Sequence, residues 1–205
     1  MREHARKGRI AQLFAWSTIA VLIASPAFAH TGVGETTGFV HGFMHPIGGL
    51  DHVLAMVAVG LFAALLGGRA LWLVPLSFVT MMAMGGLLAA RGIGLPFVEL
   101  GIGLSVVAFG AAIAFRLNVS AAVAMAFVGF FAIFHGHAHG AEMPDTASGL
   151  EYGVGFLLAT ASLHVCGIGV GAALGMSGVP GTLQVARIAG AAIALAGVSI
   201  LSGLI

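Results

Sequence analysis

The chain has 205 residues, of which 60% are hydrophobic and only 7% are charged. Soluble domains carry roughly 25% charged residues, so this composition excludes an ordinary soluble domain and indicates a membrane protein in contact with the lipid bilayer. The net charge of +1 says nothing about partners, but the sequence has no basic patch and no phosphate-binding loop, which argues against nucleic acid as a partner. The single Cys166 excludes an internal disulfide.

Residues 1–29 have the pattern of a cleavable secretory signal peptide. A basic start precedes an apolar stretch around residues 13–24, and Ala27-Phe28-Ala29 matches the small-x-small cleavage pattern. An uncleaved first membrane helix is the alternative. Cleavage after Ala29 would leave His30 as the new N-terminus, where its amine and its imidazole together form a candidate chelator for a metal ion.

Six apolar runs follow a short polar lead, and each is close to the ~20 residues that a helix needs to cross a bilayer. The runs are approximately 38–66, 70–90, 95–115, 119–140, 149–176 and 182–204. The breaks between them are short, and no soluble insert separates them. The sequence therefore predicts an all-α fold, a polytopic bundle of six transmembrane helices that forms a single membrane domain over residues 30–205.

The distribution of charge between the loops predicts the orientation of this bundle. A cleaved signal peptide leaves the mature N-terminus outside, so Arg69, Arg116 and Arg187 fall on the cytoplasmic side and only Arg91 falls outside. In the expected mature chain, the acidic residues outside the first run all fall on the outer side; they are Glu35, Glu99, Glu142, Asp145 and Glu151. Both signals agree, and we expect both mature termini on the outer side.

The first apolar run contains three histidines and a carboxylate, His41, His45, Asp51 and His52. Ionisable groups within the bilayer cost about 2.5–3.5 kcal/mol each on insertion scales, so they mark a functional path. On one straight helix, the three histidines lie within about 40° of one another and Asp51 lies about 80° to one side. A stripe of imidazoles beside a carboxylate indicates a path for a metal ion.

Helix breakers lie beside these histidines, at Pro46, Gly48 and Gly49. Backbone groups freed by such a break are tolerated in a membrane only where they face protein or a water-filled cavity. We therefore expect this part of the first run to face away from lipid.

A second group of histidines closes the fourth run. If the helix continues to its end, His135, His139 and Glu142 share one face, and His137 points away. Two imidazoles four residues apart, with a carboxylate three residues further on, suit Ni, Zn, Co or Cu. A histidine-rich solvated loop at a helix end is the alternative.

Depth along straight helices, at about 1.5 Å per residue, separates the candidate ligands into two levels. The outer level contains His41, His45, His135, His139 and Glu142, and the inner level contains Asp51, His52 and His164. Taken alone, His164 fits a hydrogen-bonded core histidine, and its alignment in depth with Asp51 makes it a candidate metal ligand as well. Cys166 fits small packing filler. Two stacked levels describe a route for an ion better than they describe one catalytic pocket.

Two motifs in these runs resemble the signature motifs of a known family. His45-Pro46-x-x-Gly49-x-Asp51-His52 and Phe134-His135-Gly136-x-Ala138-His139-Gly140-x-Glu142 are similar to those of the HupE/UreJ family. Its members are small bacterial membrane proteins that are associated with hydrogenase and urease gene clusters and regarded as nickel permeases. The resemblance covers essentially the whole chain and implies the bacterial inner membrane, so the outer side expected from the charges, with both mature termini, is the periplasmic side. It also implies a metal-handling role for His45, Asp51, His52, His135, His139 and Glu142, whereas His41 and His164 rest on geometry alone.

The sequence and the resemblance together predict a permease, not an enzyme, which moves a metal ion from periplasm to cytoplasm and uses no organic cofactor. The resemblance implies Ni²⁺ for hydrogenase or urease maturation, with handover to cytoplasmic nickel chaperones, although the ligands admit Co²⁺ or Zn²⁺ equally. The alternatives are a static intramembrane metallochaperone or metalloenzyme, a copper(I) path along methionines, and a haem electron carrier with axial histidines. Neither the coupling ion nor the oligomeric state follows from the sequence.

Overall fold

The computed structural model describes residues 38–141, 143, 149–175 and 183–204. Every helix described below belongs to one compact unit, Thr36–Ile205. The expected signal peptide, His30 and Glu142 lie outside the described residues.

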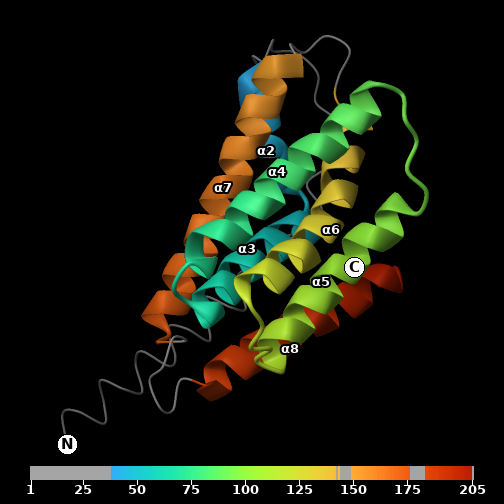
Figure 1. Ribbon diagram of the computed structural model, residues 1–205. Coiled ribbons are helices and arrows are strands. Elements are labelled where there is room, and N and C mark those ends of the chain that lie inside the picture. The colour runs from blue at the N-terminus through green and yellow to red at the C-terminus, as the bar shows by residue number, and fades with distance from the viewer. Residues whose placement is uncertain (1–37, 142, 144–148, 176–182, 205) are drawn as a thin grey trace, which may run out of the picture. The chain divides into compact units, whose positions relative to one another are not determined.

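Seven α-helices and no β-strand occur in the described part of the chain (Figure 1). Their bounds are α2 Gly38–Gly48, α3 Leu50–Leu66, α4 Ala70–Ala90, α5 Val98–Ala114, α6 Ala121–Ala141, α7 Gly149–Ala173 and α8 Leu183–Leu201. The predicted all-α fold is therefore confirmed.

Four of these helices, α4, α6, α7 and α8, are long and apolar enough to cross a membrane. The pair α2 and α3 would supply a fifth crossing if the two helices count as one span, and α5, with 17 residues, is a shorter apolar helix. The described ranges thus contain four to five candidate spans, and the predicted number of six stays a prediction.

We expected a single straight helix over residues 38–66, and this prediction is wrong, because the chain bends by 83° between α2 and α3. Gly49 at the bend has extended backbone angles, φ −98° and ψ 122°. Pro46 cannot donate its share of the helical hydrogen bonds, and glycine costs about 1 kcal/mol in a helix interior, so Pro46, Gly48 and Gly49 together end α2. His52 lies beyond the bend and does not share a helix face with His41 and His45.

The bent pair continues along α7 instead of doubling back. Gly42 of α2 lies against Tyr152 near the start of α7, and a Cβ at Gly42 would overlap the carbonyl group of Tyr152. Gly60 of α3 lies against Gly167, more than three turns further along α7. Both contacts bring backbones together at glycines, as is typical of helix packing in membranes.

Two further helix pairs position the rest of the bundle. Helices α4 and α6 run in the same direction, since Ser77 Oγ donates to the carbonyl oxygen of Met125 (2.9 Å) and Gly86 lies against Gly140 nearer their C-terminal ends. Helices α5 and α8 run in opposite directions. Gly103 near the start of α5 lies against Leu201, and Arg187 Nε near the start of α8 donates to the carbonyl oxygen of Ala114 (3.4 Å).

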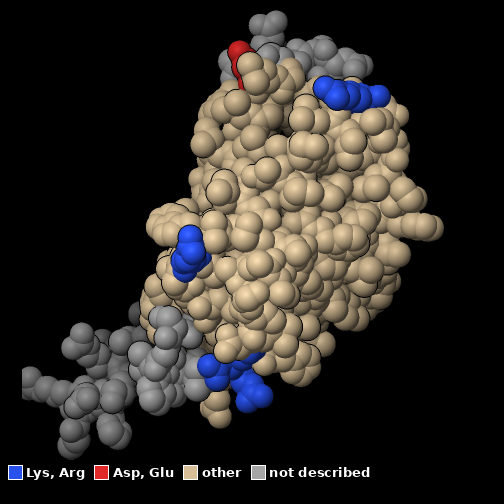
Figure 2. All heavy atoms as spheres, viewed as in Figure 1, with Lys and Arg blue, Asp and Glu red and all other residues tan. Residues whose placement is uncertain are grey.

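The interior is built from aromatic and aliphatic side chains, and the exterior is also apolar. Phe62, Phe78 and Phe109 are fully buried, whereas Trp72 and Ile188 are exposed. Figure 2 shows charged atoms at only a few places on the face drawn, with an uncharged surface between them. Large exposed apolar surfaces mark contact with another apolar phase, and for these helices that phase is the bilayer.

Candidate metal centre

Four histidines from three helices come together and form what we call the histidine cluster: His45 of α2, His52 of α3, and His135 and His139 of α6. The ring centroids are 4.8 Å apart for His45 and His139, 4.1 Å for His52 and His139, and 4.7 Å for His52 and His135. The bend at Gly49 permits this arrangement, because it turns the start of α3 toward α6. The structure thus brings together residues that are separated by up to 94 positions in the sequence.

The cluster extends outward through His41, and exposure falls along it. His41 is exposed and its ring lies 6.1 Å from that of His45, which is half-buried. His139 and His52 are buried, and His135 has no exposed surface. The tyrosine ring of Tyr152 lies 5.9 Å from His41 and 6.0 Å from His45. A graded series of imidazoles therefore leads from the surface of the described bundle into its core.

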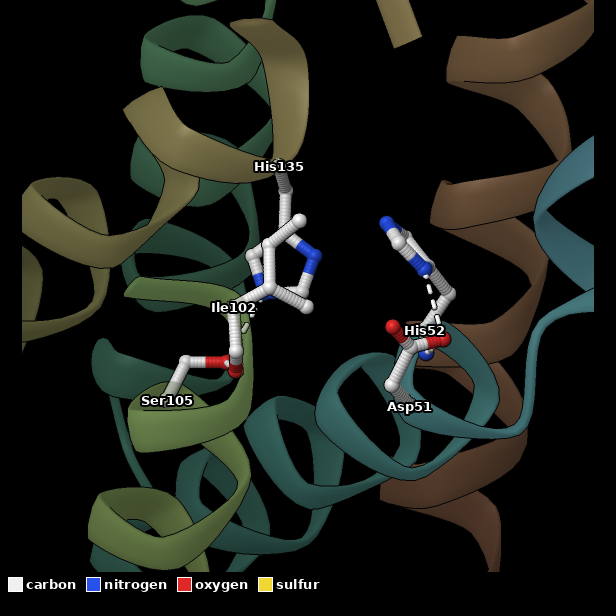
Figure 3. A network of polar contacts seen from close by, with 5 residues as sticks. All are labelled: Asp51, His52, Ile102, Ser105 and His135. Carbon is white, nitrogen blue, oxygen red and sulfur yellow. Dashed lines mark hydrogen bonds and ion pairs between the residues drawn. The ribbon is translucent and has the colours of Figure 1, made fainter. Parts of the chain in front are cut away.

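Asp51 contacts His52 twice, at the start of α3 (Figure 3). Its Oδ1 accepts a hydrogen bond from the backbone N–H of His52 (2.8 Å) and lies 2.9 Å from the ring Nδ1. The other ring nitrogen of His52, Nε2, is buried and has no hydrogen-bond partner among the described residues. A carboxylate that bonds the second nitrogen of a histidine fixes the orientation of the ring, which is a common arrangement behind metal ligands.

His135 is held from the opposite side by α5. Its Nε2 lies 2.8 Å from Ser105 Oγ, which also donates to the carbonyl oxygen of Ile102 (2.6 Å) (Figure 3). Sequence reasoning missed Ser105. A lone serine in an apolar helix gives no pattern signal, and its partner lies 30 positions away in the sequence.

His164 on α7 does not join the cluster directly. The ring of Phe78 lies between, with its centroid 5.6 Å from His135 and 5.2 Å from His164. His164 is buried, and neither ring nitrogen has a hydrogen-bond partner in the described ranges. The expected separation into two levels is wrong for His52, which contacts His135 and His139; the depth count assumed a straight first helix.

Two other candidates lie apart from the cluster. His137 Nε2 lies 2.9 Å from the carbonyl oxygen of Ile93, in the segment between α4 and α5, which agrees with the expectation that His137 points away. Cys166 is exposed on α7. Within the described residues, no group of three His, Cys, Asp or Glu side chains is placed to hold a metal ion together. Glu142, the predicted acidic member, lies outside those residues.

A cavity of about 480 Å³ lies between α4, α6 and α7 and reaches His139. Apart from His139 and Tyr152, its lining consists of glycines and apolar side chains, including Leu87, Leu150 and Phe156. Moving an ion from water into such surroundings is costly without compensating polar groups. The histidine cluster, and not this cavity, is therefore the candidate site for a metal ion.

Comparisons with known proteins agree with the motifs that surround the cluster. Residues 18–200 match the family model described as HupE / UreJ protein. Protein HupE of Rhizobium leguminosarum bv. viciae is 47% identical over 189 residues, which cover 91% of this chain and 97% of the relative. No solved structure matches the chain significantly. Since the family model covers most of the chain, this protein belongs to the HupE/UreJ family.

Proposed function

We propose that this protein is a permease that admits Ni²⁺ from the periplasm across the bacterial inner membrane. The observation that carries the proposal is the graded series of imidazoles from exposed His41 to fully buried His135. Imidazole suits Zn²⁺ and Co²⁺ as well as Ni²⁺, so the ligands alone do not select the ion. The choice of nickel rests on the family to which the chain belongs.

The spacing of the rings favours conduction over static storage. Conduction requires sites that bind an ion strongly enough to admit it and weakly enough to release it to the next site. Here neighbouring rings lie 4.1–6.1 Å apart in succession, so an ion passes from one pair of imidazoles to the next. The membrane potential adds about 2.3 kcal/mol per charge per 100 mV, or roughly 4.6 kcal/mol for a divalent cation.

The proposal extends to every candidate ligand of the path. We propose that the ion first meets His30, the first residue after the expected cleavage site, and Glu142, which follows α6 in the sequence, then the histidine cluster, and then His164 beyond Phe78. The complete set is His30, His41, His45, Asp51, His52, His135, His139, Glu142 and His164. On the cytoplasmic side, the ion passes to nickel chaperones that serve hydrogenase or urease maturation.

The proposed topology has a cleaved signal peptide over residues 1–29 and six crossings, with both mature termini in the periplasm. The antiparallel packing of α5 along most of α8 supports a crossing by α5. The contact between His137 and Ile93 supports a common side for the end of α6 and the segment between α4 and α5. The contact of Arg187 with the end of α5 supports a common side for Arg187 and Arg116.

Uptake of ⁶³Ni by cells that express wild type, Asp51→Ala or His135→Ala tests the proposal. We expect each substitution to lower uptake by about 10- to 100-fold, the range typical for loss of a metal ligand's support. His137→Gln is the matched control: it changes a neighbouring buried histidine that contacts Ile93, and uptake should remain near wild type.

Competition by Co²⁺ and Zn²⁺ in the same assay ranks the ions. A membrane fraction blot must show equal amounts of each variant. Undiminished uptake in both Asp51→Ala and His135→Ala would contradict the permease mechanism. Tight, stoichiometric metal binding without flux would favour a static metal-binding protein.

A further inference from the structure

Ser105 is a polar side chain that contacts the histidine cluster from α5, at His135. It lies on α5 and has no exposed surface. Its Oγ is 2.6 Å from the carbonyl oxygen of Ile102 and 2.8 Å from Nε2 of His135. The hydroxyl therefore stands between a backbone carbonyl oxygen and a ring nitrogen of His135.

Counting protons at these three atoms determines which nitrogen of His135 carries hydrogen. A carbonyl oxygen only accepts, so the hydroxyl of Ser105 donates its single proton to Ile102. The same hydroxyl cannot also donate to His135. In the contact of 2.8 Å, Nε2–H of His135 therefore donates to Oγ of Ser105. In a neutral imidazole the other nitrogen then holds a lone pair. That nitrogen, Nδ1, is buried and has no hydrogen-bond partner in the described part of the chain.

The same reasoning applies to His52 on the opposite side. An ionised carboxylate only accepts, so the contact between Asp51 and His52 is donated by Nδ1–H. The lone pair of His52 then lies on Nε2, which is also buried without a hydrogen-bond partner among the described residues. Figure 3 shows the two rings facing one another from α3 and α6, and their centroids are 4.7 Å apart.

We propose that Ser105 is a positioning residue that holds His135 in the Nε2–H tautomer, so that Nδ1 of His135 and Nε2 of His52 present two lone pairs to the same ion. The inference rests on the proposed function and adds how its ligand atoms are prepared. Asp51 and Ser105 have corresponding tasks, one on each histidine. Metal-ligating histidines typically donate their second N–H to such a partner, which fixes tautomer and ring orientation.

Removal of the Ser105 hydroxyl leaves Nε2 of His135 without its acceptor. The Nε2–H tautomer then loses the bond that favoured it, so the Nδ1–H tautomer becomes populated. In that tautomer the proton occupies the nitrogen that would otherwise face the ion, and the two rings no longer offer two lone pairs to it. The expected result is a change of tautomer at His135, with little change in the fold.

Nitrogen NMR of ¹⁵N-histidine-labelled, metal-free protein in detergent tests this directly, since protonated and unprotonated ring nitrogens have well-separated shifts. We expect wild-type His135 to be the Nε2–H tautomer, with its signals assigned by their loss in His135→Gln. In Ser105→Ala the population should move to Nδ1–H, and in Ser105→Cys, whose thiol is a weaker partner, it should move part of the way. Ser162→Ala is the control, because Ser162 donates only to the carbonyl oxygen of Leu158 on α7.

A wild-type His135 in the Nδ1–H form would overturn the proposal, and this measurement needs no variant. An unchanged tautomer in folded Ser105→Ala would also overturn it. ⁶³Ni uptake separates the two proposals. If the tautomer changes as expected but uptake is unaffected by both Ser105→Ala and His135→Ala, positioning stands and the permease mechanism fails. If His135→Ala abolishes uptake while Ser105→Ala changes neither tautomer nor uptake, the permease stands and positioning fails.

Discussion

The carboxylate of Asp51 contacts two groups of the next residue in the chain, His52. It accepts from the backbone N–H of His52 in the first turn of α3 and from the ring of the same residue. Sequence reasoning treated Asp51 as a metal ligand beside the histidines. Its contacts show that it orients His52 as well, and a substitution at this position therefore affects both the helix start and the ring.

Asp51→Asn separates these two effects. The amide oxygen can still accept from the backbone N–H, so the start of α3 should keep its stability to within about 1 kcal/mol, the size of one net hydrogen bond. The amide lacks the negative charge that supports a cation, and its NH₂ group can turn toward the ring. We expect ⁶³Ni uptake to fall about tenfold or more, with an unchanged thermal unfolding midpoint in detergent.

Glu151→Gln is the matched control for Asp51→Asn, because Glu151 is also a carboxylate in the first turn of a helix, α7, but is exposed. Its uptake should stay near that of wild type. Equal loss of uptake in both variants would mean that general surface charge, and not the bond to His52, explains the effect of Asp51.

The sequence was sufficient to select the histidines of the cluster but not the atoms that support them. Ionisable residues in an apolar run stand out because their burial is costly. Ser105 does not stand out, since serine is common in membrane helices, where its hydroxyl bonds a preceding carbonyl. Its contact with His135 depends on how α5 packs beside α6, and no local pattern encodes that packing.

At the scale of the helices, glycine contacts decide how closely α2 and α7 approach. Gly42 is buried, and a Cβ there would overlap backbone atoms of Tyr152, which cannot move aside as a flexible side chain could. The rings of His41 and His45 lie beside Tyr152 on the same two helices. The close approach of the backbones thus also sets the position of the outer histidines.

Gly42→Ala should separate α2 from α7. We expect a destabilisation of about 1–3 kcal/mol, typical of overpacking, and a measurable loss of ⁶³Ni uptake because His45 moves away from His139. Gly169→Ala is the control on the partner helix α7, since a Cβ at Gly169 would meet nothing within 4 Å. Thermal unfolding in detergent measures both variants. A Gly42→Ala protein as stable and as active as Gly169→Ala would show that this contact does not position the cluster.

The bend between α2 and α3 shows where helical periodicity stops predicting the positions of side chains. Pro46, Gly48 and Gly49 indicated an interruption, and the interruption is present. Helical angles, however, can be counted only along an unbroken helix, so the stripe of three histidines and the depth of His52 were both misjudged. The contacts of His52 with α6 depend on the bend of 83°, and both helices that flank the bend pack against α7.

At the scale of the whole molecule, α5 decides the number of crossings. It has 17 residues, at the lower limit of the roughly 17–25 that span a bilayer, and it packs along α8. Composition and charge predicted the membrane class and the all-α fold well, because these depend on averages over many residues. The number of spans depends on one short helix, and the average composition of the chain does not determine whether that helix crosses the membrane.

Two cysteine variants on either side of α5 test its crossing. In a Cys166→Ala background, Gly94→Cys lies before α5 and Leu117→Cys lies after it. A membrane-impermeant maleimide added to intact cells should label Gly94→Cys, and Leu117→Cys should react only after the membrane is permeabilised. Labelling of both positions from outside would exclude a crossing by α5 and reduce the number of spans.

The broken helix also determines the sign of the local electric field. The carbonyl end of α2 carries partial negative charge, while the amino end of α3 carries partial positive charge, roughly half an elementary charge each. The α3 terminus lies beside the proposed route of a cation, where its field is repulsive, and Asp51 in its first turn reverses that field. Loss of this single carboxylate would therefore convert a cation-attracting site into an anion-attracting one, and we expect Asp51→Ala to gain affinity for small anions such as chloride as it loses nickel.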